Sequence, residues 1–329
     1  MKLRLLALIL PLIIGAATLH AILPVFTWTG NSTSTGLVTE SPNWDSGVPT
    51  GTGGENAVFG SITGSQSSIQ IPASLTLNDL TFNTGRPSYS INGSGSPTLT
   101  LTGTVTVNSG AEVVFNNSLA LALSSGEHTV NIASATTLRV FSSVGEVSGV
   151  GSVKKTGDGT LVFSAPNSYT GGTVIDGGKL TLLNTTGSGT GTGTVTVNSG
   201  ANLTIGGGAS GGSLSGNIIN NATVEFAHSS DSYTYGGIIS GTGVLNKIGA
   251  GSLTLTGANT YGGGTSISNG SLTIGVTNAL PTSTSVTMSS TAALNVNQNQ
   301  TLAGLSGSNT NSIAIASGKS LTLNNTAGL

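Results

Sequence analysis

The sequence predicts an all-β solenoid whose coils stack short strands into long parallel sheets. Three observations support this. Apolar residues alternate with Ser, Thr and Asn, Gly and Asn turns separate strand-length runs, and long segments recur. Only 6% of the 329 residues are charged, whereas 36% are hydrophobic. A disordered chain is rich in charge and poor in apolar residues, so this composition favours a folded body with polar, uncharged outer faces.

Residues 1–21 have the pattern of a secretory signal peptide. A short positive segment precedes the apolar run at 5–14, and small residues follow, so we expect cleavage after Ala21 or Ala17. A membrane anchor is the alternative, but the apolar run is shorter than the ~20 residues that a spanning helix needs. No later segment resembles a membrane span, and we expect none in the mature chain.

Residues 22–60 differ in composition from the rest of the chain, and we expect them to cap the N-terminal end of the solenoid. Both tryptophans, Trp28 and Trp44, lie here among Pro and Gly turns. An open solenoid end would expose apolar interior and unpaired strand edges, so the first coil needs a cover. We expect residues 61–329 to form the parallel β-helix itself, with essentially no helical structure outside the signal peptide.

Two families of repeats recur along the chain. The segment GTVTVNSGA occurs at 103–111 and again at 193–201, and a weaker copy lies at 286–296. A longer motif, K-x-G-x-G-x-L followed by N-x-Y-x-G-G-T-x-I, occurs in the segments 149–182 and 241–274. A module of about 90 residues is too long for one supersecondary unit, so each module should contain several coils. A propeller is less favoured, because its blades usually carry a recurring aromatic signature and Trp is absent after residue 44.

The two copies of the longer motif share positions that we interpret as structural corner and stacking residues. They are Lys155, Gly157, Gly159, Asn167, Tyr169, Gly171 and Gly172 in the first copy, and Lys247, Gly249, Gly251, Asn259, Tyr261, Gly263 and Gly264 in the second. We expect the lysines to bond turn carbonyls; a surface contact is the alternative. We expect the tyrosines to be buried, with stacking on a sugar ring as the alternative. The glycines should mark corners without room for a Cβ atom.

These two segments resemble the passenger-associated transport repeat, also called the autotransporter-associated β-strand repeat. The resemblance rests on GxGxxxKxGxGxLxL followed by NxYxGGTxIxxGxLxL, and the W…NW…G-V-P…F-G opening at 28–60 resembles the flanks of the same large exported bacterial proteins. It implies a right-handed parallel β-helix, whose repeats assist secretion and folding of a passenger stalk, and outer-membrane secretion machinery as a partner during export. Such proteins end in a β-barrel, an anchor or a sorting tail. This chain stops in mid-pattern at LTLNNTAGL, which leaves a fragment or a short unanchored relative open.

No group of residues has the spacing of a catalytic, cofactor-binding or metal site, and we expect none. The chain has no cysteine, which excludes thiolate zinc sites and disulfides. We interpret the isolated His128 and His228 as surface residues. The Asp-Ser-Gly at 45–47 lacks the glycines and the preceding histidine of a serine protease. The Gly-rich run at 187–193 follows no βα unit, so a nucleotide-binding loop is not expected.

The sequence therefore favours a non-catalytic, secreted or cell-surface bacterial protein that serves as stalk, matrix or adhesin scaffold. One alternative is a degenerate polysaccharide lyase or hydrolase on the same fold, although scattered acidic residues weigh against it. Another is a carbohydrate-binding module that uses exposed Tyr and Asn ladders. Extracellular polysaccharide and surface proteins are candidate partners. A net charge of −2 without a basic block argues against nucleic acid.

Overall fold

The computed structural model describes residues 25–28, 44–45, 48–51, 54–60, 68–83, 88–108, 112–146, 150–207, 211–289 and 291–324. The expected signal peptide and part of the expected cap lie outside these residues. The described parts contain 33 β-strands and no helix. They accordingly include no helix of the length and apolar character needed to span a bilayer.

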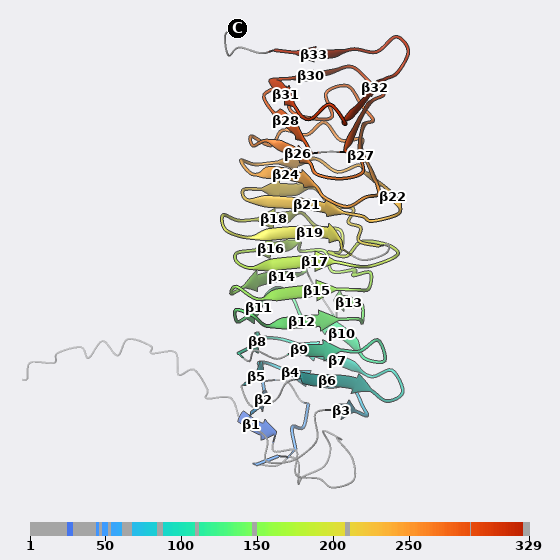
Figure 1. The fold of residues 1–329 in the computed structure, drawn as a ribbon. Helices are drawn as coiled ribbons and strands as arrows, with labels where there is room; N and C mark the ends of the chain where they lie inside the picture. Colours follow the sequence, from blue (N-terminus) through green and yellow to red (C-terminus); the bar gives the residue numbers. More distant parts are fainter. Residues whose placement is uncertain are drawn as a thin grey trace, which may run out of the picture.

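Most strands belong to two long parallel sheets that run along the solenoid (Figure 1). Sheet one contains, in order, β1 (Val25–Trp28), β2 (Asn56–Phe59), β5 (Leu80–Phe82), β8 (Val105–Val107), β11 (Gly126–Ile132), β14 (Gly151–Thr156), β16 (Thr173–Ile175), β18 (Val195–Val197), β20 (Ile218–Asn220) and β23 (Ile239–Ser240). Sheet two contains β3 (Ser68–Ile71), β6 (Ser88–Gly93), β9 (Glu112–Phe115), β12 (Thr137–Val140), β15 (Thr160–Phe163), β17 (Lys179–Leu182), β19 (Asn202–Gly206), β21 (Thr223–Ala227), β24 (Val244–Lys247), β26 (Thr265–Ile267), β28 (Ser285–Met288) and β31 (Gly304–Ser306).

Three shorter sheets complete the coils. Sheet three, in the N-terminal half, contains β4 (Leu75–Leu77), β7 (Thr98–Leu101), β10 (Ala120–Leu123) and β13 (Val144–Glu146). Sheet four, in the C-terminal half, contains β22 (Ser232–Tyr235), β25 (Ser252–Leu255), β27 (Ser271–Ile274), β29 (Ala293–Val296) and β32 (Ser312–Ile315). Sheet five pairs β30 (Gln300–Leu302) with β33 (Leu321–Leu323).

A strand inside a sheet pairs with the strand one coil earlier and with the strand one coil later, an edge strand pairs on one side only, and all the pairings between these strands are parallel. Val130 pairs with Val105 and with Lys155, 25 residues away in each direction. Towards the C-terminus the coils shorten, and Leu245 pairs with Thr265, 20 residues later. The described chain makes about 11 turns. The predicted all-β parallel solenoid is therefore confirmed, and a module of about 90 residues corresponds to roughly four coils.

Alternating residues produce the strands and decide which side chains enter the core. In β17 the leucines at 180 and 182 are buried, whereas Lys179 and Thr181 face outward. Parallel strands lie about 4.8 Å apart, so inward side chains of successive coils touch. One such ladder consists of Leu138, Leu161, Leu180, Leu203, Val224 and Leu245. These ladders form one continuous apolar core along the solenoid.

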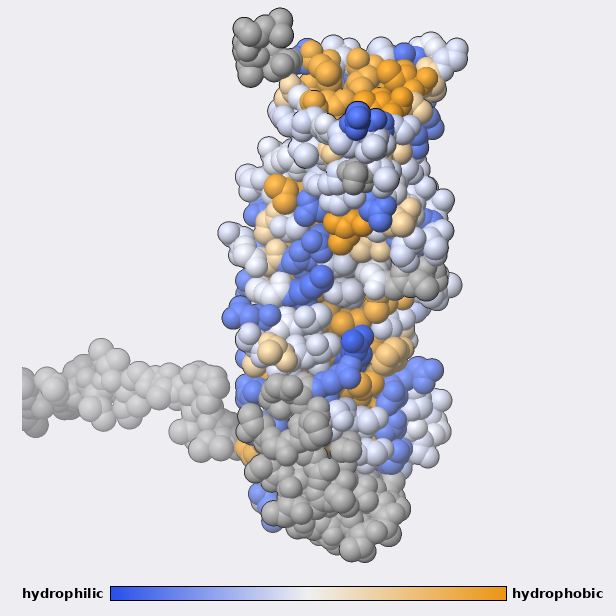
Figure 2. All heavy atoms as spheres, in the orientation of Figure 1, coloured by the Kyte–Doolittle hydropathy of each residue, from blue (hydrophilic) through white to orange (hydrophobic). Residues whose placement is uncertain are grey.

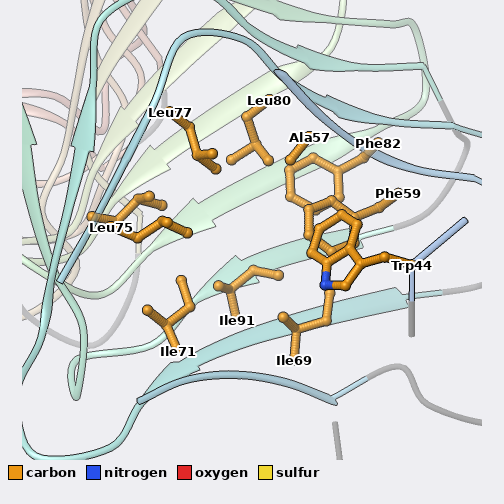
Figure 3. A pocket seen from close by; sticks show the side chains of 11 residues that line it. Trp44, Ala57, Phe59, Ile69, Ile71, Leu75, Leu77, Leu80, Phe82 and Ile91 are labelled. Atoms are coloured by element: carbon orange, nitrogen blue, oxygen red, sulfur yellow. The ribbon is translucent and has the colours of Figure 1, made fainter. Parts of the chain in front are cut away.

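Aromatic rings fill the interior of the first described coils. Trp28 is buried and meets Trp44 edge-on with ring centroids 5.1 Å apart, and Phe59 stacks on Phe82 at the same separation. Figure 3 shows Trp44, Phe59 and Phe82 facing aliphatic side chains from several coils across an apolar space. The tryptophans thus belong to the core at this end. Whether residues 22–60 cap the solenoid stays a prediction, because much of that segment lies outside the described residues.

The outer surface is mostly polar, as the alternation predicts. Figure 2 shows hydrophilic and intermediate side chains over most of the visible face, with apolar side chains gathered near the C-terminal end of the described stack. There β32 exposes Ile313 and Ile315, and β33 exposes Leu323.

Leu180→Ala should lower the free energy of unfolding by about 2–5 kcal/mol, because Leu180 fills the ladder between Leu161 and Leu203 and the change leaves a cavity. Thr181→Ala, the adjacent outward position, should change it by less than about 0.5 kcal/mol. Urea unfolding followed by circular dichroism measures both. Equal destabilisation by the two changes would contradict the assignment of inward and outward faces.

Candidate functional site

The two copies of the longer motif lie on different faces of the solenoid. Lys155 lies in β14 of sheet one, whereas its counterpart Lys247 lies in β24 of sheet two. Likewise Leu161 belongs to sheet two and its counterpart Leu253 to sheet four. The 92 residues between the copies are not a whole number of coils, so the second copy is shifted by one face. Each copy nevertheless builds the same arrangement of buried polar groups.

Lys155 is the centre of the first arrangement. Its side chain has no exposed surface. The residues that pair with it in the two neighbouring strands, Val130 and Ile175, are apolar. Its Nζ donates hydrogen bonds to the carbonyl oxygens of Thr156 (2.8 Å), Gly157 (2.7 Å) and Gly177 (3.2 Å). An ammonium group has three donors, and here each of them meets an acceptor, which makes its burial tolerable. Because Gly177 lies in the next coil, the lysine ties the corners of two coils together.

Lys247 repeats this arrangement in the second copy. It is also fully buried, and its Nζ donates to the carbonyl oxygens of Gly249 and, at 3.3 Å in the next coil, Asn269. Burial lowers the pKa of Lys155 to about 8, and burial lowers the pKa of Lys247 to about 8. Both lysines therefore act as cross-links inside the body of the protein. Neither is available as a surface contact.

The shared asparagines bond to the coils on both sides. The Oδ1 atom of Asn167 accepts a hydrogen bond from the backbone N–H of Val144 at 2.8 Å, and its Nδ2 donates to the carbonyl of Gly189 at 2.6 Å. Asn259 makes the equivalent pair of bonds to the backbone of its flanking coils, at 2.7 Å each. Each amide thus replaces two backbone bonds where no strand ladder is present.

The shared tyrosines lie inside the coils. Tyr169 and Tyr261 are fully buried, and their hydroxyls lie 2.6 Å from the Oγ1 atoms of Thr173 and Thr265. Neither ring can stack on a sugar, so a carbohydrate platform built on these tyrosines is excluded. Thr173 and Thr265 are hydrogen-bond partners of the tyrosines to which the sequence pattern assigned no role. Their shared position, four residues after the tyrosine in N-x-Y-x-G-G-T, was the available signal.

Most of the shared glycines lie against backbone of the preceding coil. A Cβ atom on Gly157 would lie 2.4 Å from a carbonyl oxygen, and one on Gly249 only 2.0 Å from the carbonyl oxygen of His228. Gly172 has a φ of +88°, which disfavours other residues. Gly264 differs, since its nearest neighbour would be 3.7 Å away. The same crowding by a carbonyl oxygen, at 2.6 Å or less, occurs at Gly159, Gly171, Gly251 and Gly263.

The interpretation of the two histidines as surface residues is wrong. His128 and His228 are 3% and 1% exposed. The ring nitrogens of His128 lie 3.3 Å and 3.0 Å from the carbonyl oxygens of Gly103 and Ser124, and His228 Nε2 lies 2.7 Å from the carbonyl oxygen of Gly212. Corner carbonyls without a strand partner accept hydrogen bonds from these rings, so imidazole groups are stable in the interior.

The other acidic residues considered as catalytic candidates, Asp45 and Glu225, are engaged in hydrogen bonds or ion pairs. Asp45 Oδ1 accepts a hydrogen bond from the backbone N–H of Thr27 at 2.9 Å, while residues 46–47 lie outside the described residues. Glu225 accepts a bond from Thr204 at 2.8 Å and pairs with Lys179 at 3.6 Å. In the part of the chain that the structure describes, no three His, Asp or Glu side chains gather closely enough to hold a metal ion.

Comparison with known proteins places the motif in a family. The model of the passenger-associated-transport-repeat family matches residues 153–182 and 245–274, so the chain contains two copies of this repeat. The Adhesin BmaC autotransporter of Brucella suis biovar 1 (strain 1330) is 33% identical over 163 residues. That match covers 45% of this chain and 4% of the relative, so the chain corresponds to a small part of that protein. No solved structure matches the chain.

Gly249→Ala should lower the free energy of unfolding by more than about 1 kcal/mol, because the methyl group would overlap the carbonyl oxygen of His228. Gly264→Ala is the matched control from the same motif, and it should leave the melting temperature almost unchanged. Thermal unfolding of both variants and the parent chain provides the comparison. An unchanged melting temperature for Gly249→Ala would remove the assignment of a closed corner.

The stability of the protein should rise with pH between about pH 8 and about pH 10. The pKa of Lys155 and that of Lys247 are near 8 when folded and near 10.5 when unfolded, so the unfolded chain binds more protons in this window. Each lysine can contribute up to about 1.4 kcal/mol per pH unit. Urea unfolding at several pH values should show this slope, and the Lys155→Met plus Lys247→Met variant should show a flatter one. Identical slopes would mean that the ammonium groups are not buried.

Proposed function

We propose that this chain is a non-catalytic β-solenoid that is exported to the bacterial cell surface or the medium. It serves there as a stalk or adhesin-like passenger whose repeats support folding and secretion. One observation carries the proposal: two copies of a transport repeat, on different faces, each join successive coils through a buried lysine and a buried asparagine. The relative is named an adhesin autotransporter, which supports the same role for the matched stretch.

The arrangement can assist secretion because each coil is bonded only to its neighbours. In a stacked array, folding can propagate from one finished unit to the next. A coil whose corner is fastened by Lys155 and Asn167 presents a fixed strand edge and a fixed apolar ladder to the next segment. A chain emerging at the cell surface would then fold coil by coil, and each completed coil would oppose backward movement. This is a role in assembly, and it needs no chemical reaction.

Localisation and partners follow from the same proposal. Residues 1–21 direct export, and the secretion machinery of the outer membrane is the partner during transit. Residues 22–60 form the N-terminal cap; the packing of Trp28 on Trp44 supports this role. Once the chain is outside, extracellular polysaccharide or surface proteins contact the polar faces of the solenoid.

A degenerate polysaccharide lyase or hydrolase is less favoured, because the carboxylates at Glu112, Asp176 and Glu225 are each engaged in ion pairs.

Export of the whole chain from its own N-terminus in a Gram-negative host tests the proposal. The parent chain should appear outside the cytoplasm in a protease-resistant form. Asn167→Ala plus Asn259→Ala should lower that yield several-fold, because each change breaks bonds to two coils at once. Quantitative blotting of cell fractions with and without protease measures the yield.

Asn220→Ala is the matched control. Asn220 is also buried and bonds the next coil through Val244, but it lies outside the repeats. At equal thermal stability it should reduce the exported yield less than the repeat variant does. A parent chain retained in the cytoplasm would contradict the exported role. Equal losses in the repeat and control variants would contradict a special contribution of the repeats.

A further inference from the structure

The sequence contains two Asn-Gly pairs, Asn92-Gly93 and Asn269-Gly270, and the fold gives them opposite surroundings. An asparagine loses its side-chain amide most readily before glycine, because glycine has no Cβ atom to shield the backbone nitrogen that follows. In that reaction the nitrogen of the glycine attacks the side-chain carbonyl carbon of the asparagine. The rate in a folded chain therefore depends on where these two groups are held.

The amide of Asn92 is fixed between neighbouring coils. Asn92 lies in β6, its Nδ2 donates to the carbonyl oxygen of Ile69 at 3.4 Å, and its Oδ1 accepts from Nδ2 of Asn116 at 2.7 Å. The N–H of Gly93 points elsewhere and donates to Oγ of Ser118 at 3.0 Å. The attacking nitrogen and the amide of this pair are thus engaged with different partners, and we expect it to be protected.

Asn269 lies in an exposed turn between β26 and β27. Its Oδ1 accepts a hydrogen bond from the N–H of Gly270 at 2.8 Å, so the side-chain carbonyl already contacts the nitrogen that must attack it. Among the described residues, its amide makes no hydrogen bond to another coil. The amide is therefore free to rotate about the Cβ–Cγ bond, which brings its carbonyl carbon under the nitrogen.

The buried ammonium group of Lys247 acts on the same peptide. Its Nζ donates to the main-chain carbonyl oxygen of Asn269 at 3.3 Å. When the nitrogen of Gly270 loses its proton, amide resonance carries negative charge to this oxygen, and the ammonium group stabilises that charge. Burial lowers the pKa of Lys247 to about 8, so the group is mostly charged at neutral pH. The lysine thus makes the attacking nitrogen more acidic.

The first copy of the repeat has the lysine without the amide. Gly177 and Gly178 occupy the positions of Asn269 and Gly270. Lys155 Nζ donates to the carbonyl oxygen of Gly177 at 3.2 Å, but a glycine has no side chain to be attacked. The second copy therefore combines an Asn-Gly pair with a buried cation, and the first copy does not.

We propose that Asn269 is a site of spontaneous deamidation, in which the nitrogen of Gly270 displaces ammonia and Lys247 assists. Hydroxide or water takes the proton from the nitrogen, the bond from this nitrogen to Cγ forms, and the bond from Cγ to Nδ2 breaks as ammonia leaves with a proton. Water then opens the five-membered ring at one of its two carbonyl groups. The products are aspartate and isoaspartate, and water is the only co-reactant.

The modification changes a corner that joins two coils. Aspartate adds a negative charge there, whereas isoaspartate also routes the backbone through Cβ and Cγ and lengthens it. The corner has little room, because a Cβ atom on Gly270 would lie 2.2 Å from the carbonyl oxygen of Gly251. In isoaspartate the carbonyl group that Lys247 binds becomes a carboxylate outside the main chain. We therefore expect the isoaspartate form to melt at a lower temperature than the unmodified chain.

Peptide mapping by mass spectrometry of the purified full chain, incubated at neutral pH in ¹⁸O-labelled water, tests the proposal. Conversion incorporates the heavy oxygen at the modified residue. Asn269 should convert at least about tenfold faster than Asn92 in the folded chain, and the two rates should become similar in urea. Lys247→Met should slow Asn269 by about tenfold, because a donor to the developing negative charge is lost.

Gly177→Asn is the complementary variant, because it places an amide beside Lys155. A Cβ atom at this position would lie 3.3 Å from its nearest neighbour, the carbonyl oxygen of Gly157, so the corner can accept it with a small shift. Position 177 should then convert at a rate close to that of Asn269. Lys155→Met, which removes the matched lysine in the unmodified motif, should leave the rate at Asn269 unchanged.

Two results would overturn the proposal. If Asn269 converts no faster than Asn92 in the folded chain, the corner protects it and is not a modification site. If the Lys247→Met chain has an unchanged thermal melt and converts Asn269 as fast as the parent, the lysine takes no part. Where Lys247→Met does not fold, the Gly177→Asn chain decides the same question, and an unconverted position 177 rejects the role of the lysine.

Discussion

The structure depends on parallel strands that stack in register from one coil to the next. Each inward side chain must pack on the residues directly above and below it, so a ladder such as Leu161, Leu180 and Leu203 stays apolar along its length. Backbone bonds along the same strands satisfy the polar groups of the flat faces. The corners have neither advantage, because the chain turns there and leaves carbonyl oxygens without strand partners.

Several buried polar side chains of the described residues bond to the backbone at these corners. Lys155 and Lys247 fill the corner with donors, Asn167 supplies one donor and one acceptor, and His128 meets carbonyls on both sides of its ring. A lysine inside a solenoid is therefore a way to satisfy several carbonyls at once. Near His228 this satisfaction is incomplete, because the Nδ1 atom of that ring has no hydrogen-bond partner among the described residues.

Period-two alternation predicted the faces of the strands well and failed at the corners. The inward residues of β17 follow directly from K-L-T-L, because a strand places successive side chains on opposite sides. A residue in a turn has no such rule, so the burial of His228 could not be read from its neighbours in the chain. The buried state of Lys155 follows from bonds to Gly177 in another coil, which the sequence predicts only through the repeated motif.

The local order of residues is enough to produce the strands of each coil and the hydrogen bonds that lie within each copy of the motif. The bonds from Tyr169 to Thr173 and from Lys155 to Gly157 lie within the motif, so the same letters produce the same contacts in both copies. The face that each copy occupies and the coils that it joins depend on the accumulated lengths of all the intervening coils, so they become known only from the complete fold. The same is true of the corner at His228, which is followed by a strand, β22, that pairs on one side only, with β25.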